Sequence, residues 1–287
     1  MKKKIAFRFF NKKNNVLAYT SLYKKTNLKE VYPANQKRLK IIISILKKIK
    51  PKKIIDSGCG AGLPLIKIKK LGFNIVGYDK SNAMVLEAKK NLQRSKLNTN
   101  LVFKDDFEKV KYIKNNTVDC ILGMGTFYYS KNIKKTLTMQ KSKLKKNGRL
   151  IFSLRNKLFD IATMNNYSIN FFSELYDIKN KDKKIKKIFK NLFKGYIKRQ
   201  NIKVKNIDDH KVFSNSHNPL SIQRDLLDDL NLTLKGIYFY HFHSLPPFFE
   251  NLTPLKFRKE SWKNEKPNDW KGNFLASGFV IDCLNKG

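Results

Sequence analysis

The sequence predicts an α/β protein with a doubly wound, mostly parallel seven-stranded sheet, an antiparallel last strand and a helical cap insertion. Three observations predict it. Strand-like and helix-like segments alternate over residues 36–155, which is typical of a parallel sheet with helices on both faces. A glycine-rich turn at 58–62 joins the first strand to a helix. Two strand-like segments, 233–243 and 274–283, complete the sheet near the end of the chain.

The first predicted helix covers residues 34–49, because Leu39, Ile42 and Leu46 recur at helical spacing and Pro51 ends the pattern. Ser81 is the expected N-cap of another helix over 81–94. The turn Asn147-Gly148 leads into the fifth strand. The remaining elements before the cap are strands over 53–56, 74–79, 100–104, 118–123 and 149–154, and helices over 63–71 and 131–145.

The alternating pattern stops after residue 155. We expect four parts in the chain: an N-terminal helical or irregular segment over the ligand-binding edge of the sheet, a Rossmann-like core, a helical cap or lid insertion, and a C-terminal helix with the closing strand pair. These parts span residues 1–35, 36–155, 156–212 and 213–287.

The composition is strongly basic, with 61 Lys and Arg against 22 Asp and Glu and a formal net charge of +39. The excess is mostly lysine spread along the whole chain, so a solvated basic surface explains it better than one nucleic-acid-binding stripe. A nucleic-acid partner is kept as the less favoured alternative. No apolar segment is long enough to span a membrane. The three separated cysteines (Cys59, Cys120 and Cys283) favour free thiols in a reducing cytoplasm, and no metal site is expected.

Acidic and glycine residues follow four successive predicted strands. The loop Gly58-x-Gly60-x-Gly62 follows the first, and Asp79 ends the second, 23 residues after Asp56. Asp105 and Asp106 follow the third strand and Gly123 the fourth. The carboxyl ends of parallel strands meet at one edge of the sheet, where such folds bind ligands. An acid near position 79 is placed to accept hydrogen bonds from ribose hydroxyls.

The glycine spacing restricts which nucleotide fits. A dinucleotide fingerprint would need a glycine where Leu63 stands, and a phosphate-binding loop would need Gly-Lys-Ser/Thr, which is absent. A tight strand-to-helix turn without a ligand is the structural alternative.

The segment Ile54–Gly62 resembles motif I of class I S-adenosylmethionine (SAM)-dependent methyltransferases. Residues 76–81, 104–107, 118–124 and 144–150 resemble their later motifs. The resemblance implies SAM as the cofactor, with Asp56, Gly58 and Gly60 at its methionine end and Asp79 at its ribose. It also places either Asp106 or Asp105 at the adenine amine, Phe107 against the adenine ring, and Gly123 and Met124 beside the sulfonium.

Residues outside these motifs indicate the acceptor. His241 and His243 face one side of a predicted strand and are candidate acceptor contacts or general bases. Tyr128 and Tyr129 follow the fourth-strand motif, and Tyr23 lies in the N-terminal segment, so these three are candidate pocket residues. We expect methyl transfer to an O or N atom of a small molecule. The alternatives are an RNA or protein methyltransferase that uses the basic surface, and a non-catalytic SAM-binding protein.

Overall fold

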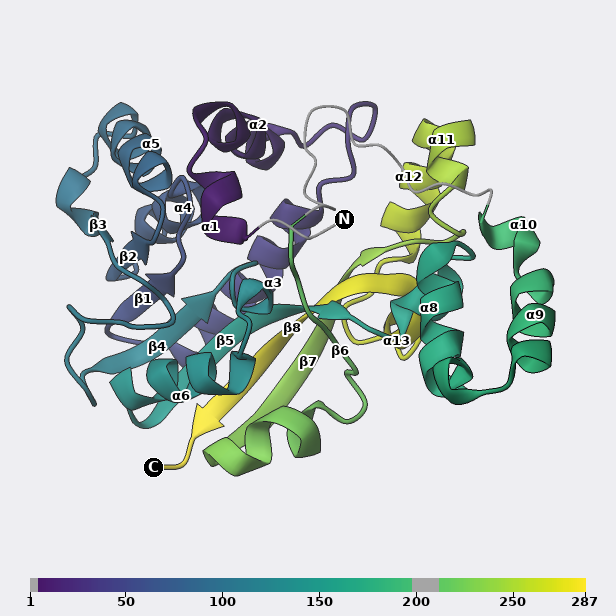
Figure 1. The fold of residues 1–287 in the computed structure, drawn as a ribbon. Helices are drawn as coiled ribbons and strands as arrows, with labels where there is room; N and C mark the ends of the chain where they lie inside the picture. The colour runs from purple at the N-terminus through teal and green to yellow at the C-terminus, as the bar shows by residue number, and fades with distance from the viewer. Residues whose placement is uncertain (1–4, 198–211) are drawn as a thin grey trace.

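A computed structural model describes residues 5–197 and 212–287 of the chain. One sheet forms its centre, in the strand order β3-β2-β1-β4-β5-β8-β7, with β6 paired to β5 (Figure 1). The strands are β1 (Ile54–Ser57), β2 (Ile75–Asp79), β3 (Val102–Lys104), β4 (Val118–Gly123), β5 (Leu144–Asn156), β6 (Ser216–His217), β7 (Leu232–Phe242) and β8 (Ala276–Asn285).

The predicted fold class is confirmed. Strands β1 to β5 pair in parallel, and β8 runs antiparallel between β5 and β7. The sheet has one strand more than the seven predicted, because the two-residue β6 pairs Ser216 with Arg155 and His217 with Asn156. So short a segment carries no strand periodicity that the sequence could show.

The helices before the cap are α1 (Ala6–Phe10), α2 (Lys13–Lys24), α3 (Ala34–Ile49), α4 (Leu63–Lys70), α5 (Asn82–Arg94) and α6 (Ile133–Lys143). The later ones are α7 (Phe159–Ala162), α8 (Asn166–Leu175), α9 (Lys183–Leu192), α10 (Lys194–Ile197), α11 (Phe249–Leu252), α12 (Pro254–Asn264) and α13 (Gly272–Leu275). Ser81 caps α5 as predicted, since its Oγ accepts a hydrogen bond from the Met84 amide at 3.2 Å.

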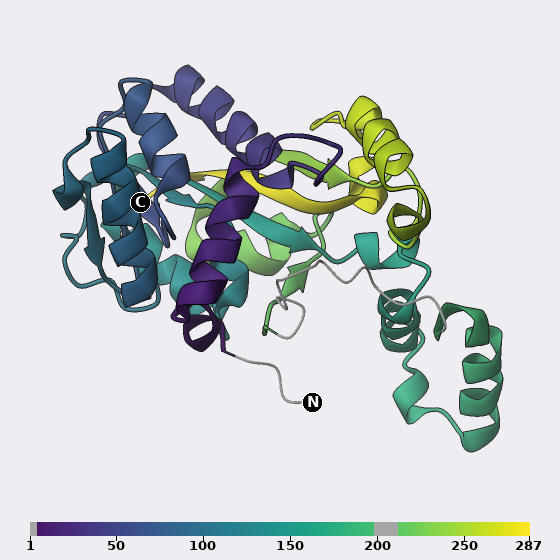
Figure 2. The same ribbon diagram turned by 90° about the horizontal axis from the view of Figure 1, so that it is seen from above.

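Alternating strand residues build a core on each face of the sheet. Ile54 belongs to the cluster under α3, α4 and α5, which includes Ile42 and Leu65. Its neighbour Ile55 faces the opposite cluster, which includes Leu137 of α6. The period-two alternation of strand side chains thus gives both faces an apolar surface for helices to cover (Figure 2).

Two local predictions differ in part from the structure. The C-terminal helix, which the sequence predicts from about residue 218 to about 230, is a π-helix (Gln223–Leu227) followed by a 3-10 turn (Asp228–Leu230). The expected turn at Asn147-Gly148 lies inside β5, where Asn147 has a φ of 63° and the β4–β5 register shifts. Leu144 pairs with Val118 before the irregularity and Arg149 with Cys120 after it, so the chain forms an irregular strand where local turn chemistry alone predicted a turn before the strand.

The insertion after β5 is helical in its described part and contains α7 to α10. In Figures 1 and 2 helices α8 to α10 project away from the sheet. Residues 1–4 of the expected N-terminal part and 198–211 of the expected cap lie outside the described residues. No helix in the described ranges has the length and apolarity that crossing a membrane requires.

Candidate functional site

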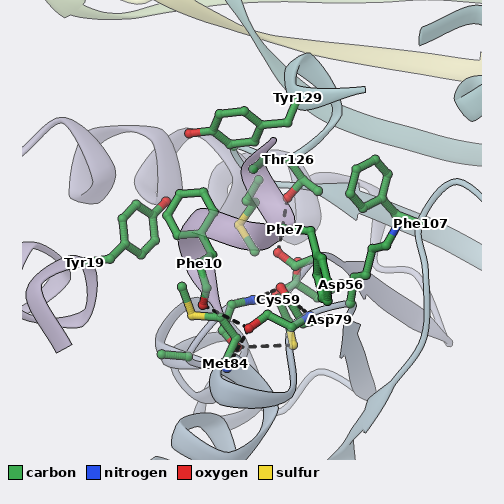
Figure 3. A pocket seen from close by; sticks show the side chains of 18 of the residues that line it. Phe7, Phe10, Tyr19, Asp56, Cys59, Asp79, Met84, Phe107, Thr126 and Tyr129 are labelled. Atoms are coloured by element: carbon green, nitrogen blue, oxygen red, sulfur yellow. Dashed lines mark hydrogen bonds between the residues drawn. The ribbon is translucent and has the colours of Figure 1, made fainter. Parts of the chain in front are cut away.

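A pocket lies at the carboxyl ends of β1, β2 and β4, beneath the N-terminal helices (Figure 3). Strand β1 leads directly into the glycine loop, and α4 begins after it. The amides of Gly58 and Cys59 both donate to the Tyr78 carbonyl, at 2.8 and 2.9 Å, which fixes the loop to β2. The predicted meeting of loop and strand ends is therefore present.

Gly58 and Gly60 of the loop are glycines for different structural reasons. A Cβ on Gly58, which has a φ of 76°, would lie 2.3 Å from the Thr126 Cγ2 atom. Gly60 has a φ of 53°, and the nearest atom to a Cβ there is the Met84 sulfur at 3.9 Å. Gly58 is thus required by packing, whereas Gly60 leaves open space at the pocket wall for a ligand to approach the backbone.

Asp79 joins the glycine loop to the start of α5. Its two carboxylate oxygens accept hydrogen bonds from the backbone amides of Gly60 and Ser81, each at 2.9 Å. Enclosure by protein raises the pKa of Asp79 to about 6, although these amide donors oppose the shift. The carboxylate lines the pocket and keeps further acceptor capacity for a ligand's hydroxyl groups.

Asp56 lines the same pocket with an unsatisfied carboxyl group. The residue is buried, and neither of its side-chain oxygens accepts a hydrogen bond from any residue in the described ranges. Burial raises the pKa of Asp56 to about 7, with the negative charge of Asp79 acting in the same direction and Arg38 opposing it. Buried carboxyl groups are normally paired, so this one indicates a ligand that brings a donor or a positive charge.

The two aspartates that follow β3, Asp105 and Asp106, make different contacts. The Asp105 carboxylate accepts hydrogen bonds from the amides of Asp106, Lys111 and Tyr112, and so holds its own loop together. Asp106 forms an ion pair with Lys80 at 2.7 Å. Neither aspartate lines the pocket, although Lys80, Phe107 and Glu108 do. Of the two residues, Asp106 is the one whose ion-pair partner forms part of the pocket wall.

The turn after β4 forms another wall. Gly123 lies behind the ring of Phe127 and does not line the pocket, whereas Met124, Gly125 and Thr126 do. The Gly125 amide donates to Ser153 Oγ at 2.9 Å, and Thr126 Oγ1 donates to the Gly58 carbonyl at 3.1 Å. This turn is thereby fixed both to β5 and to the glycine loop.

Aromatic residues of the N-terminal segment cover the pocket. Phe7 and Phe10 come from α1, and Tyr19 and Tyr23 from α2. The Phe10 ring packs edge-on against Tyr19 and against Tyr129, with centroids 5.4 and 5.7 Å apart. The sequence suggested Tyr23 here but missed Phe7 and Phe10. The one feature of the sequence that could have indicated these two phenylalanines is the mostly apolar run to which they belong within a basic segment.

Arg38 of α3 is a buried cation that the sequence analysis did not single out. Its Nη2 atom donates to the Tyr23 hydroxyl at 2.5 Å and to Asn35 Oδ1 at 3.1 Å. The guanidinium also lies against Gly125, where an added Cβ would be 2.6 Å from Nη1. Within the described ranges its hydrogen-bond partners are neutral, so its charge acts on Asp56 from behind the pocket wall.

The two candidate histidines lie in a different cluster. His241 Nδ1 is 2.7 Å from Ser277 Oγ, and its ring stacks on Tyr32. His243 is buried against Phe159 and Phe257. Burial lowers the pKa of His241 to about 4 and also lowers that of His243. Neither histidine lines the pocket, so a catalytic contact from either one stays a prediction.

Of the other residues that the sequence predicted for the acceptor pocket, some line the pocket and some do not. Tyr23 and Tyr129 line the pocket, whereas Tyr128 is buried beside it with the Arg155 guanidinium 5.2 Å from its ring centroid. No described residue of the 156–212 insertion lines the pocket. Among residues 5–197 and 212–287 no cluster of His, Cys, Asp and Glu is arranged to hold a metal ion.

Comparisons with known proteins agree with this architecture. Residues 31–191 match the family model described as a methyltransferase domain. A Haemophilus influenzae protein of uncharacterized function is 32% identical over 145 residues, which cover 46% of this chain and 57% of that protein. The chain thus matches little more than half the length of this relative.

Two solved structures show the same fold across nearly their whole length. Magnesium protoporphyrin IX methyltransferase from Synechocystis, determined with bound S-adenosylhomocysteine (SAH), has a TM-score of 0.60 at 15% identity and covers 98% of both chains. A SAM-dependent methyltransferase from Thermotoga maritima has a TM-score of 0.53 at 16% identity, covering 98% of this chain and 99% of its own. At these identities the likeness is one of fold.

Proposed function

This chain belongs to the methyltransferase domain family, and we propose that it transfers a methyl group from SAM to an O or N atom of a small-molecule acceptor. The observation that carries the proposal is the buried Asp56 carboxyl group, which has no hydrogen-bond partner in the described part of the chain and lies beside the Asp79–Gly60 contact. Together they form a pocket end that suits a cationic adenosine derivative. Bound SAM would supply a methyl group on a sulfonium that is already activated as a leaving group.

Charge distinguishes this ligand from phosphorylated nucleotides. Asp56, Asp79 and Glu108 all line the pocket, and Lys80 is the lysine among its lining residues. The Lys80 ammonium is already paired with Asp106 and lies 3.9 Å from a Glu108 oxygen. Phosphates would be repelled by these carboxylates, whereas the ammonium and sulfonium of SAM would be attracted.

The proposed cofactor would give roles to several residues in and beside the pocket. Asp56 would bind the ammonium of the methionine part, Asp79 the ribose hydroxyls, and Gly60 would allow close approach of the backbone. Phe107 would pack against the adenine ring. Asp106 is favoured over Asp105 for the adenine amine, because Asp105 already accepts bonds from three backbone amides.

A small acceptor is favoured by the cover over the pocket. Phe10 is held in place because its carbonyl accepts a hydrogen bond from Ser81 Oγ at 2.9 Å. Its ring and those of Tyr19 and Tyr129 enclose the space above the cofactor position. Such a cover excludes water and orients an acceptor, and positioning supplies much of the rate of a displacement reaction.

Calorimetry with SAH and with NAD tests the cofactor. We expect heat with SAH and none with NAD, and the reverse result would refute the proposal. SAH release is then measured over a panel of phenols, carboxylic acids and amines, with a mixed RNA preparation as the comparison. Turnover with a small molecule supports the acceptor class, and turnover with RNA alone overturns it.

A further inference from the structure

Helix α9 (Lys183–Leu192) has two chemically distinct faces. At roughly 100° per residue, Ile185, Ile188, Phe189 and Leu192 fall within one narrow stripe of the helix surface. The opposite side carries five lysines, which are Lys183, Lys184, Lys186, Lys187 and Lys190. The helix contains no acidic residue. Apolar and basic residues are therefore fully separated on this ten-residue helix, whereas lysines are scattered along the rest of the chain.

Among residues 5–197 and 212–287 the apolar stripe has no partner that would explain it as part of a core. The exposed fractions of Ile185, Ile188 and Leu192 are 42%, 51% and 73%. Phe189 packs on Phe193, which in turn stacks near Phe172 of α8. This small aromatic contact joins α9 to α8 and leaves the other apolar side chains of the stripe in solvent. Leu175 and Tyr176, at the end of α8, are also exposed.

The lysines are free to meet an external anion. Nearby acidic side chains have other partners: Asp182 caps α9 through the Ile185 amide, Asp177 binds the Asn180 side chain, and Glu174 pairs with Lys157. In the described part of the chain, the five α9 lysines form no ion pair. The helix also projects from the sheet domain, so a broad surface can approach it (Figure 2).

We propose that α9 binds the surface of an anionic lipid bilayer, lying parallel to it with the apolar stripe inserted among the headgroups. Lys184 and Lys186 border the stripe, so their methylene stems can follow it inward while their ammonium groups contact lipid phosphates. An interfacial helix needs both an apolar face and a basic polar face. A nucleic acid would use the lysines alone and leave the stripe unexplained, and an acidic protein groove would have to match lysines over half the helix circumference.

Co-sedimentation of the full chain with vesicles tests this proposal. Vesicles contain phosphatidylcholine alone or mixed with phosphatidylglycerol. The variant Ile188→Ser/Leu192→Ser removes the exposed stripe at constant charge, and Lys184→Glu/Lys187→Glu reverses two charges on α9. A matched control, Lys114→Glu/Lys146→Glu, makes the same charge change at two exposed lysines elsewhere. Far-UV circular dichroism and thermal unfolding verify that each variant is folded.

We expect the parent chain and the matched control to sediment with phosphatidylglycerol vesicles and much less with phosphatidylcholine alone. Both α9 variants should lose several-fold of this binding. Three results would overturn the proposal. The stripe variant could bind like the parent, the control could lose as much as the α9 charge variant, or α9-dependent binding could occur to single-stranded RNA and not to vesicles.

Discussion

The backbone amide of Gly60 donates a hydrogen bond to Asp79 Oδ2 at 2.9 Å, and this contact joins the glycine loop after β1 to the end of β2. The second oxygen of the same carboxylate holds the start of α5 through the Ser81 amide. One side chain therefore fixes the shape of the loop and also presents the charge that faces the pocket.

Replacing Asp79 with alanine should therefore weaken SAH binding by about ten- to a hundredfold, since a hydrogen bond to a charged group contributes about 1.5–3 kcal/mol. Asp79→Asn keeps the shape and should lose less. Calorimetric titration measures both dissociation constants. Wild-type affinity in Asp79→Ala would show that the proposed ribose contact is wrong.

Stability of the ligand-free protein should depend on pH through Asp56. Its folded-state pKa of about 7 lies above the ordinary value of 3.8, so the folded protein holds a proton that the unfolded chain releases. This contribution to stability is fully present below about pH 4 and is lost as the pH rises to about 7. Asp56→Asn removes it. Thermal midpoints from pH 4.5 to 8 should therefore fall more steeply with rising pH for the parent than for the variant.

Cofactor binding should show the opposite trend with pH. The ligand's ammonium group pairs best with the charged form of Asp56, so SAH affinity should increase as the pH rises through about 7. Titrations across this range measure the midpoint. A flat profile between pH 6 and 8 would contradict a direct contact between Asp56 and the ligand's ammonium group.

Arg38 should tune that midpoint without touching the ligand. Its positive charge lowers the pKa of Asp56, so Arg38→Met should move the binding midpoint to higher pH. Arg38→Lys keeps the charge and is the matched control. An unchanged midpoint in Arg38→Met would mean that the two groups do not interact across the pocket wall.

Two glycine substitutions should separate folding from binding. Gly58→Ala places a methyl group 2.3 Å from the Thr126 side chain at a positive φ, and we expect a loss of about 1–3 kcal/mol in unfolding free energy. Gly60→Ala meets no atom closer than 3.9 Å, so the strain of its positive φ alone should cost about 1–2 kcal/mol, less than Gly58→Ala, while reducing SAH affinity. Urea denaturation and calorimetry measure the two effects. Equal stability losses would contradict the packing argument.

Much of the fold was predictable because its signals are local. The helix expected at 34–49 is α3 (Ala34–Ile49), since Leu39, Ile42 and Leu46 recur at the helical period and pack under the sheet. Where pairing on both sides enclosed a turn-like pair, the prediction failed in part. Asn147-Gly148 has the composition of a turn, yet it lies within β5 because Leu144 and Arg149 on either side pair with β4.

The sequence by itself determined the sheet, the glycine loop and the acids Asp56 and Asp79 at its edge, because strand order and motif spacing place them there. Only the tertiary structure decided that Asp105 is used by its own loop and that His241 and His243 lie away from the pocket. It also decided that Phe10 lines the pocket and that Arg38 lies behind its wall, against Gly125. The reason is physical. The position of a residue directly after a parallel strand fixes that it lies at the ligand-binding edge of the sheet. Contacts between α1, α3 and the sheet depend instead on how separate elements pack.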